Sequence, residues 1–274
     1  PLPTHGVPGE LLPLVHQINA LLARLEGSLD AQRRFLADAA HELRSPVAAL
    51  ALQVQLAERA HTPAAREAAF LELAHGVERA RRLVQQLLDF ARLEPGVQPE
   101  PFVATDLARL AREVVGRYAA QAEAQDVDLG ADAPPSAVML GSEPQLRALI
   151  ENLVDNALRY APRGTAVTVS VRARDDGLEL GVVDAGRGIP AAERERVFER
   201  FHRVAGDHTR GSGLGLAISR AIVEQHQGSI ALSDAQPGAP LPGLAVTVRF
   251  PAPPAAQALS QQQFKSALSF GGAS

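Results

Sequence analysis

The chain has 274 residues, a length that corresponds to about two domains of ordinary size. Its net charge of −4 gives no electrostatic case for binding nucleic acid, and the absence of cysteine excludes disulfides, thiol nucleophiles and cysteine metal sites. No apolar run approaches the length of about 18 residues that suggests a membrane-spanning helix. Because the only methionine is Met139, we expect a portion of a longer protein whose N-terminal region is missing.

Apolar residues recur at heptad spacing in the N-terminal part of the chain. Residues 11–29 carry a coiled-coil seam, and a second stretch continues it at Leu43, Val47, Leu50, Val54 and Ala57. The segment 60–65 breaks this helix, and the next helix has a seam at Leu73, Val77, Ala80, Val84, Leu87 and Ala91. The spacing predicts an antiparallel helical hairpin, and burying its apolar stripes predicts a homodimer with a four-helix bundle.

The prolines and glycine of residues 94–101 indicate a linker, after which the pattern changes to that of a mixed α/β sandwich with antiparallel hairpins. Helices are predicted over 106–125 and 142–161, and Ser142 and Gln145 fit a capping box. A turn is expected at 176–177, and strands are expected at 127–130, 137–141, 166–175, 178–184, 228–234 and 243–250. The tail is rich in proline, alanine and glutamine and is expected to be disordered.

Two glycine-rich segments, "DAGRGIP" (184–190) and "GSGLGLAIS" (211–219), are candidates for binding phosphate. Glycines before a helix N-terminus let backbone N–H groups approach phosphate oxygens, although an ordinary turn explains either segment alone equally well. Neither segment is a Walker A loop, because the required Gly-Lys-Ser/Thr is absent.

The predicted helix 142–161 places Asn152, Asn156 and Arg159 on one face. A solvated helix face is the simpler interpretation of such polar residues. Against it, asparagine is a poor helix former, and its amide oxygen suits Mg²⁺, which commonly bridges nucleotide phosphates.

Five motifs, taken together, resemble those of the sensor histidine kinases of bacterial two-component systems. "HELRSP" (41–46) resembles the phosphoacceptor box of that family, and "NLVDNALRY" (152–160) resembles its asparagine box. "DAGRGIP" and "GSGLGLAI" (211–218) resemble its two glycine boxes, and "FERFHR" (198–203) resembles its phenylalanine box. The motifs stand in the family's order, over roughly residues 30–250. Residues 8–26 also resemble the last helix of a HAMP relay module.

The resemblance implies an α+β protein: a dimeric helical hairpin that forms a four-helix bundle, followed by an ATP-binding α/β sandwich of the histidine kinase, gyrase and MutL type. The implied divisions are a HAMP-like relay helix over 1–29, a dimerisation and phosphotransfer hairpin over 30–93, the linker 94–101, the ATP-binding domain 102–251 and the tail 252–274. The implied location is the cytoplasmic portion of a bacterial inner-membrane protein, which meets the membrane only through its missing N-terminal region.

The resemblance also implies roles for individual residues. Asn156 would ligate Mg²⁺, and Asn152 would support the metal or the phosphates. Asp184 would accept a hydrogen bond from the adenine amino group. Arg159 and Arg203 would contact phosphates, and residues 199–212 would form a lid over ATP. The remaining nucleotide-binding positions would be Tyr160, Gly186, Gly188, Ile189, Phe198, Gly211, Gly213, Leu214, Gly215 and Leu216.

The phosphoacceptor box explains an unusual proline inside a helix. On a helical wheel His41 lies opposite the apolar seam and points to water, with the carboxylate of Glu42 beside it as a candidate base. Pro46 removes the hydrogen bond to the carbonyl of Glu42, so the helix can bend where the histidine must meet another domain. Ser45 shares the face of His41 and is either a residue that holds water for dephosphorylation or a tolerated helix residue.

We therefore expect an ATP-dependent protein histidine kinase that phosphorylates His41 and passes the phosphoryl group to an aspartate of a response regulator receiver domain. The same kinase could also dephosphorylate that regulator. An ATPase of the gyrase and MutL type is the main alternative, and the heptad hairpin that carries His41 argues against it. A degenerate binding scaffold is a third alternative, and the five complete motifs argue against that one.

Overall fold

The computed structural model describes residues 8, 10–93, 101–204 and 212–252. The chain divides into two compact units, Pro1–Leu87 and Leu88–Ser274. Most of the linker 94–101, Gly211 and nearly all of the tail 252–274 lie outside the described residues. Among those that are described, no helix combines the length and the apolar character that crossing a bilayer requires.

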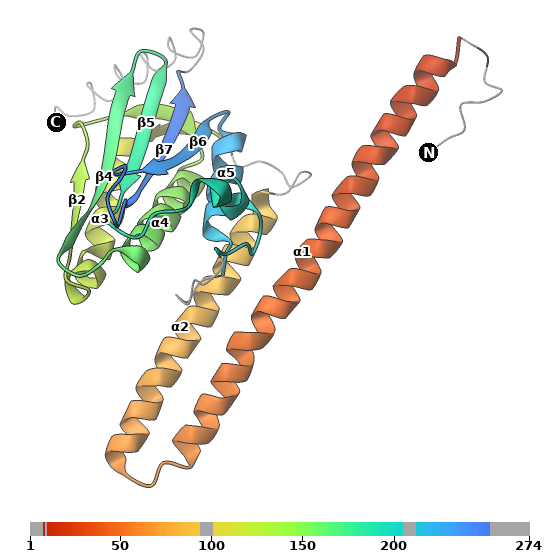
Figure 1. The fold of residues 1–274 in the computed structure, drawn as a ribbon. Helices are drawn as coiled ribbons and strands as arrows, with labels where there is room; N and C mark the ends of the chain where they lie inside the picture. Colours follow the sequence, from red (N-terminus) through yellow and green to blue (C-terminus); the bar gives the residue numbers. More distant parts are fainter. Residues whose placement is uncertain (1–7, 9, 94–100, 205–211, 253–274) are drawn as a thin grey trace, which may run out of the picture. The chain divides into compact units, whose positions relative to one another are not determined.

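The N-terminal unit is built from two long helices, α1 (Leu12–Glu58) and α2 (Pro63–Leu93), which run antiparallel as a hairpin (Figure 1). The helix α1 continues through Pro46 without a break. After the turn, the hydroxyl of Thr62 accepts a hydrogen bond from the N–H of Ala65 at 3.2 Å, which caps the start of α2. The predicted hairpin is therefore present.

The predicted seams divide into two sets that alternate along each helix. Leu43, Leu50 and Ala57 on α1 are partly buried, as are Leu73 and Ala80 on α2, and Leu87 is buried. The intervening valines are exposed, with Val47 at 60% and Val77 at 53%. The buried Gly76 of α2 shows one contact of the first set, because a Cβ there would lie 2.8 Å from Leu50 Cδ2 on α1. A single hairpin thus covers only every second seam position.

The C-terminal unit is a five-stranded mixed sheet with helices against one face (Figure 1). Its strand order is β2-β4-β5-β7-β6, in which β2 and β4 are parallel and the other neighbours are antiparallel. A small antiparallel pair, β1 with β3, stands beside it. The helices are α3 (Leu107–Ala124), α4 (Glu143–Tyr160) and α5 (Gly215–Gln225). The strands are β1 (Val103–Asp106), β2 (Val127–Asp132), β3 (Val138–Gly141), β4 (Thr165–Arg174), β5 (Gly177–Val183), β6 (Ser229–Asp234) and β7 (Leu244–Pro251).

The core of this unit lies between the sheet and the helices. Val167, Val169 and Val171 of β4 are fully buried on alternate positions, which is the period of a strand with one covered face. The buried residues of α4 are Leu146, Leu149, Ile150, Leu153, Val154, Ala157 and Leu158. With its helical hairpin and this mixed sheet, the chain has the predicted α+β fold.

Two local predictions were wrong. The turn between β4 and β5 is Asp175–Asp176, not 176–177, and Gly177 is already paired with Arg174. Glycine is required at 177 for another reason: its φ is 149°, and a Cβ there would lie 1.9 Å from the carbonyl oxygen of Phe250 in β7. Strand β1, in "VATD", was not anticipated, because four residues with a single buried position carry little period-2 signal.

The capping box at the start of α4 is only half formed. The hydroxyl of Ser142 accepts a hydrogen bond from the N–H of Gln145 at 3.4 Å, as predicted. The reciprocal bond is missing within the described part of the chain, because the N–H of Ser142 donates instead to Nε2 of His226 at 3.1 Å. Oε1 of Gln145 is buried and has no partner among the described residues. A residue 84 positions away thus replaces the local partner.

Candidate functional site

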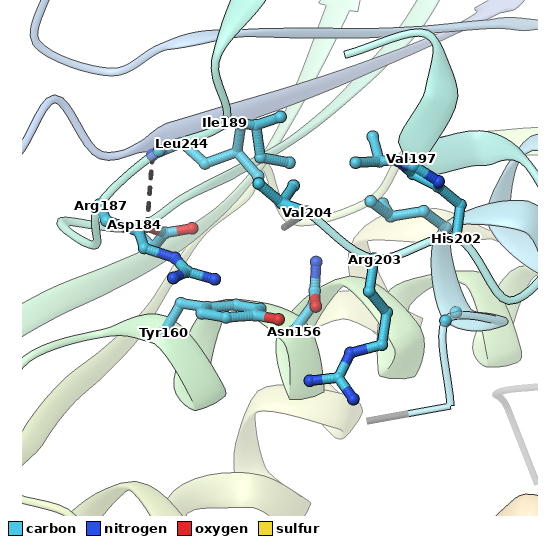
Figure 2. Close-up of a pocket in the computed structure, with 14 residues that line it drawn as sticks. Asn156, Tyr160, Asp184, Arg187, Ile189, Val197, His202, Arg203, Val204 and Leu244 are labelled. Atoms are coloured by element: carbon cyan, nitrogen blue, oxygen red, sulfur yellow. Dashed lines mark hydrogen bonds between the residues drawn. The ribbon is translucent and has the colours of Figure 1, made fainter. Parts of the chain in front are cut away.

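A cavity in the C-terminal unit is lined by residues from four of the five motifs (Figure 2). One wall comes from α4, a second from the loop after β5 with Leu244 of β7, and the rest from residues 197–204 and 213–216. The residues that line it are Asn156, Tyr160, Asp184, Arg187, Gly188, Ile189, Val197, His202, Arg203, Val204, Gly213, Gly215, Leu216 and Leu244.

Asp184 directly follows β5 and is almost fully buried, at 6% exposed. Its Oδ1 accepts hydrogen bonds from the N–H of Gly186 at 2.8 Å and from the N–H of Leu244 at 3.2 Å. Burial raises the pKa of this carboxyl, and the two backbone hydrogen bonds oppose that rise. The other carboxylate oxygen is turned toward the cavity (Figure 2), where it can accept a hydrogen bond from a ligand.

The loop after Asp184 runs so close to its neighbours that side chains would not fit. A Cβ on Gly186 would lie 2.7 Å from the carbonyl oxygen of Tyr160. Gly188 has a φ of +69°, and a Cβ there would lie 2.9 Å from the carbonyl oxygen of Gly243. The two glycines of this motif therefore shape the wall of the cavity, although only Gly188 lines it.

The helix α4 contributes Asn156 and Tyr160, which are four residues apart and point into the cavity (Figure 2). Asn152 lies one turn earlier, and its Oδ1 is 3.9 Å from the position that a Cβ on Gly215 would take. It therefore faces the start of α5, beside the cavity. Arg159 does not line the cavity; its guanidinium donates to Asp155 Oδ2 at 2.5 Å. Its position on α4 directs it to the carboxylate four residues earlier, so the predicted phosphate contact has no support from this geometry.

The second glycine box leads into α5. Gly213 has a φ of +71°, and a Cβ there would lie 2.7 Å from the carbonyl carbon of Phe201. Leu214 is fully buried and anchors the loop, whereas Gly215 and Leu216 line the cavity at the first turn of α5. The free N–H groups and positive end of a helix dipole favour an anion at such a place.

The phenylalanine box lies on the opposite side of the cavity from Asp184 (Figure 2). Phe198 is buried with its ring 3.9 Å from the guanidinium of Arg220, so it supports the segment without lining the cavity. Arg203, His202 and Val204 do line it. Of the predicted lid 199–212, residues 205–211 lie outside the described residues.

Five lining residues were not anticipated from the sequence: Arg187, Val197, His202, Val204 and Leu244. The guanidinium of Arg187 lies 5.3 Å from the ring centre of Tyr160, a cation–π distance. His202 and Val204 flank the predicted Arg203, so their position in the motif was a usable signal. Leu244 lies at the site only because β7 pairs with β5, and no local sequence pattern predicts that pairing.

The phosphoacceptor residues belong to the N-terminal unit and are described there by themselves. His41 and Ser45 are exposed on α1, and Glu42 is half-buried. Pro46, inside the same helix, has no N–H to give to the carbonyl of Glu42. The helix nevertheless stays continuous, so the missing hydrogen bond weakens it without breaking it.

The donors at the cavity fit a nucleotide with Mg²⁺ better than they fit a metal held by protein alone. Within the described ranges, no group of three or more His, Cys, Asp or Glu side chains could hold a metal ion. The amide oxygen of Asn156 is one hard ligand, and Mg²⁺ usually keeps several waters and binds substrate phosphates with only one or two protein ligands. Asn156 therefore suits a metal that arrives with a polyphosphate.

Two family models match the chain. The "His Kinase A (phospho-acceptor) domain" matches residues 31–96, and "Histidine kinase-, DNA gyrase B-, and HSP90-like ATPase" matches residues 141–254. The sensor protein kinase PmrB of Pseudomonas aeruginosa is 40% identical over 252 residues, which is 92% of this chain and 52% of that protein. This chain thus spans about half the length of that relative.

Solved structures show the same likeness. The mycobacterial sensor histidine kinase MprB is 32% identical and has a TM-score of 0.51, over 56% of this chain and 99% of that one. The Acinetobacter baumannii histidine kinase AdeS has a TM-score of 0.63 at 22% identity, over 78% of this chain and 98% of that one, which indicates a shared fold.

Proposed function

Because this chain belongs to the sensor histidine kinase family, we propose that it binds ATP in the cavity beside Asp184 and transfers the γ-phosphoryl group to His41. The observation that supports this most strongly is the make-up of the cavity. At one end, the buried carboxylate of Asp184 has an oxygen that can accept a hydrogen bond from a nucleobase. At the other end, Gly213, Gly215 and the N-terminus of α5 suit phosphates.

The end of the cavity at Asp184, which would hold the nucleobase, favours a base that carries a hydrogen-bond donor. An ionised carboxylate only accepts hydrogen bonds, so Asp184 favours an exocyclic amino group such as that of adenine. Ile189 and Leu244 provide apolar surface for the ring, and Tyr160 provides an aromatic edge or face. The N–H groups of Gly186 and Leu244 keep the carboxylate in place before the ligand arrives.

The phosphate end uses backbone and positive charge. Gly213 and Gly215 leave room for the backbone at the start of α5 to approach phosphate oxygens, and Arg203 adds a guanidinium to the same cavity. Asn156, with Asn152 behind it, would hold Mg²⁺. That ion would neutralise charge on the phosphates as the terminal group leaves.

The transfer itself needs a nucleophile that water can reach and a base for its proton. His41 is exposed on α1, and one of its ring nitrogens, with its lone pair free, would form the bond to the γ-phosphorus as the bond from phosphorus to the bridging oxygen of ADP breaks. The proton on the other ring nitrogen would pass to Glu42, the adjacent carboxylate. The missing hydrogen bond at Pro46 would let this turn adjust to the approaching ATP-binding unit.

We propose the divisions that this reaction requires: a relay helix over 1–29, a dimerisation and phosphotransfer hairpin over 30–93, a linker over 94–101 and an ATP-binding domain over 102–251.

The exposed second seam supports a homodimer, because Val47, Val54, Val77 and Val84 would be covered in a four-helix bundle. The relative PmrB is named a sensor protein kinase and is nearly twice as long as the matched region. We propose that this chain is the cytoplasmic portion of a longer, membrane-anchored sensor.

A receiver domain of a response regulator would accept the phosphoryl group on an aspartate. Leu52 and Leu56 are exposed at 57% and 56%, and they lie on the His41 face of α1. Exposed apolar residues on the same helix face as a phosphorylated histidine suit a protein partner that must dock before it reacts. This face is the proposed site of transfer.

The test is whether His41 becomes phosphorylated. With ATP labelled at the γ position, the parent chain should gain label that survives alkali and is lost in acid. His41→Gln should abolish the label while nucleotide affinity, measured by titration, stays within about twofold, because His41 is outside the cavity. His75→Gln, an exposed histidine on α2, is the matched control and should keep the label. Label on His41→Gln at the parent's rate would overturn the proposal.

A further inference from the structure

His202 lines the cavity within the segment that the family resemblance assigns to a lid, but its side chain has no predicted role of its own. It follows Phe201 at the end of the phenylalanine box, and its side chain is only 15% exposed. It lines the cavity at the end away from Asp184 (Figure 2), the end that the proposed function gives to the phosphates. An imidazole there can contact the part of the nucleotide that reacts.

Glu193 forms a hydrogen bond with the imidazole ring of His202. Its Oε2 lies 2.8 Å from Nε2 of His202, and its Oε1 lies 2.9 Å from Nη1 of Arg196. The hydrogen bond from His202 lowers the pKa of Glu193 most, burial opposes this, and the charge of Arg196 lowers the pKa further. Glu193 is therefore ionised near neutral pH and can only accept hydrogen bonds.

This contact determines which ring nitrogen carries hydrogen. Because Glu193 accepts, Nε2 of His202 must donate, which leaves Nδ1 as the nitrogen that changes its proton. A neutral ring offers a lone pair at Nδ1, which phosphate oxygens repel. A protonated ring offers an N–H and a positive charge, both of which phosphate attracts.

The charged groups around His202 come from several directions. Glu193 favours the imidazolium, whereas Arg196, on the short helix η2 (Arg196–Phe198), and the neighbouring Arg203 oppose it. Asp184 and Arg187 belong to the opposite end of the cavity (Figure 2). On the α5 side, Arg220 pairs with Glu195 at 3.0 Å and lies against Phe198. An arriving polyphosphate adds several negative charges to this balance and shifts it toward protonation.

We propose that His202 is a phosphate-binding residue, positioned by Glu193, that contacts the nucleotide as an imidazolium, so that nucleotide binding takes up a proton. This inference rests on the proposed ATP site and deepens it. In it Nδ1 gains a proton from solvent and donates it in a hydrogen bond to a phosphate oxygen, and no covalent bond is made or broken. Glu193 acts through His202 and is a positioning residue.

The uptake can be measured by calorimetry. The parent chain is titrated with the magnesium complex of a non-hydrolysable ATP analogue at pH 7.5, in buffers with different ionisation enthalpies. The dependence of the observed heat on the buffer gives the number of protons bound. Titration of the nucleotide's own phosphates is the same for every variant and cancels in the comparison.

We expect the parent to take up more protons than His202→Gln, which should also bind the analogue about tenfold more weakly. Glu193→Gln should reduce the uptake and shift the pH dependence of the affinity to lower pH, since the ring then lacks its carboxylate. Glu195→Gln, a carboxylate two residues away that pairs with Arg220, should match the parent. A His202→Gln variant with the parent's affinity and uptake would overturn the inference.

Two outcomes separate this inference from the proposed function. If the parent binds no nucleotide, the ATP site itself is refuted. If the parent binds nucleotide and phosphorylates His41, only the behaviour of His202 is in question. Should His202→Gln fail to fold, nitrogen NMR of the parent decides the matter: the analogue must move Nδ1 of His202 to its protonated shift, and an unchanged shift would refute the contact.

Discussion

Asp184 and Leu244 are 60 residues apart in the sequence, yet Oδ1 of the first accepts the backbone N–H of the second at 3.2 Å. The bond forms because Asp184 follows the last residue of β5 and Leu244 is the first residue of β7, and these strands are neighbours in the sheet. It keeps a buried carboxylate in one orientation at the edge of the cavity. Burial raises the pKa of Asp184, so the ionised form that a ligand uses is disfavoured in the empty site.

Replacing Asp184 with asparagine should therefore weaken nucleotide binding and raise the stability of the nucleotide-free protein. The amide oxygen can still accept from Gly186 and Leu244, while the buried charge is removed. At pH 7 we expect the nucleotide-free Asp184→Asn variant to melt at a higher temperature than the parent. The difference should vanish as the pH falls below the ordinary range of an aspartate, because the parent is then protonated too. Nucleotide affinity should fall at least about tenfold.

Asp106→Asn is the control for the sign of this effect. Burial raises the pKa of Asp106. Hydrogen bonds from the N–H groups of Ala137, Arg109 and Ala108 lower that pKa, and because they outweigh burial, its pKa lies below the ordinary value. The stability that ionised Asp106 contributes is present at neutral pH and lost in acid. Asp106→Asn should thus lower the melting temperature at pH 7. Thermal melts of both variants at pH 7 and pH 3.5 must show opposite signs at neutral pH.

A second prediction compares two glycines with nearly equal backbones. Gly213 and Gly164 have φ values of +71° and +74°, so alanine at either position is strained by about 1–2 kcal/mol. Only at Gly213 would the new Cβ also collide, at 2.7 Å from the carbonyl carbon of Phe201, whereas Gly164 has open space. We expect Gly213→Ala to bind nucleotide more weakly than the parent. In urea unfolding, it should also lose more stability than Gly164→Ala does. Equal losses in both variants would show that the collision is relieved.

The third prediction concerns the metal. Asn156→Ala removes the amide oxygen that lines the cavity, so the gain in nucleotide affinity on adding Mg²⁺ should shrink by about tenfold. Affinity for metal-free nucleotide should change little and serves as the internal control. If Mg²⁺ strengthens binding equally in the variant and the parent, Asn156 is not a ligand.

The fourth prediction concerns assembly. Val77 and Val84 are exposed on one side of α2, and changing both to aspartate would bury charge in a four-helix bundle. Light scattering should then report monomers, while the nucleotide-binding unit keeps its affinity. Leu52→Asp with Leu56→Asp is the matched control: these residues are as exposed but lie on the His41 face, so the dimer should persist. A dimeric Val77→Asp, Val84→Asp variant would contradict the bundle.

The last prediction concerns Ser45, which is exposed one turn after His41. A hydroxyl there can hold water near the phosphorylated aspartate of a docked regulator, or it can be an ordinary helix residue. On the first hypothesis Ser45→Ala keeps autophosphorylation but slows dephosphorylation of the regulator, and Ser45→Thr restores it. The rate of loss of labelled phosphate from the regulator measures this. Indistinguishable rates for alanine and serine would leave Ser45 with only a helical role.

Local signals predicted most of the individual elements. Heptad spacing marked both long helices, Thr62 and Pro63 marked the turn between them, and alternating valines marked β4. Asp184, Asn156 and Gly213 were chosen because they stand in short motifs that resemble those of sensor histidine kinases, and an amide or a glycine at these places also has a chemical reason. These features depend on neighbours within about one or two helical turns, which is the distance over which a sequence pattern carries information.

Tertiary structure decided which side of each element would be used. Packing within the hairpin partly buries Leu50 and leaves Val77 exposed, and which seam positions are covered depends on where the second helix lies. The start of α4 shows the same dependence, because His226 displaces Gln145 as the partner of Ser142. Leu244 reaches the cavity only because β7 pairs with β5. Burial, hydrogen bonding and charge at such positions are set by residues far along the chain, so the folded structure alone determines them.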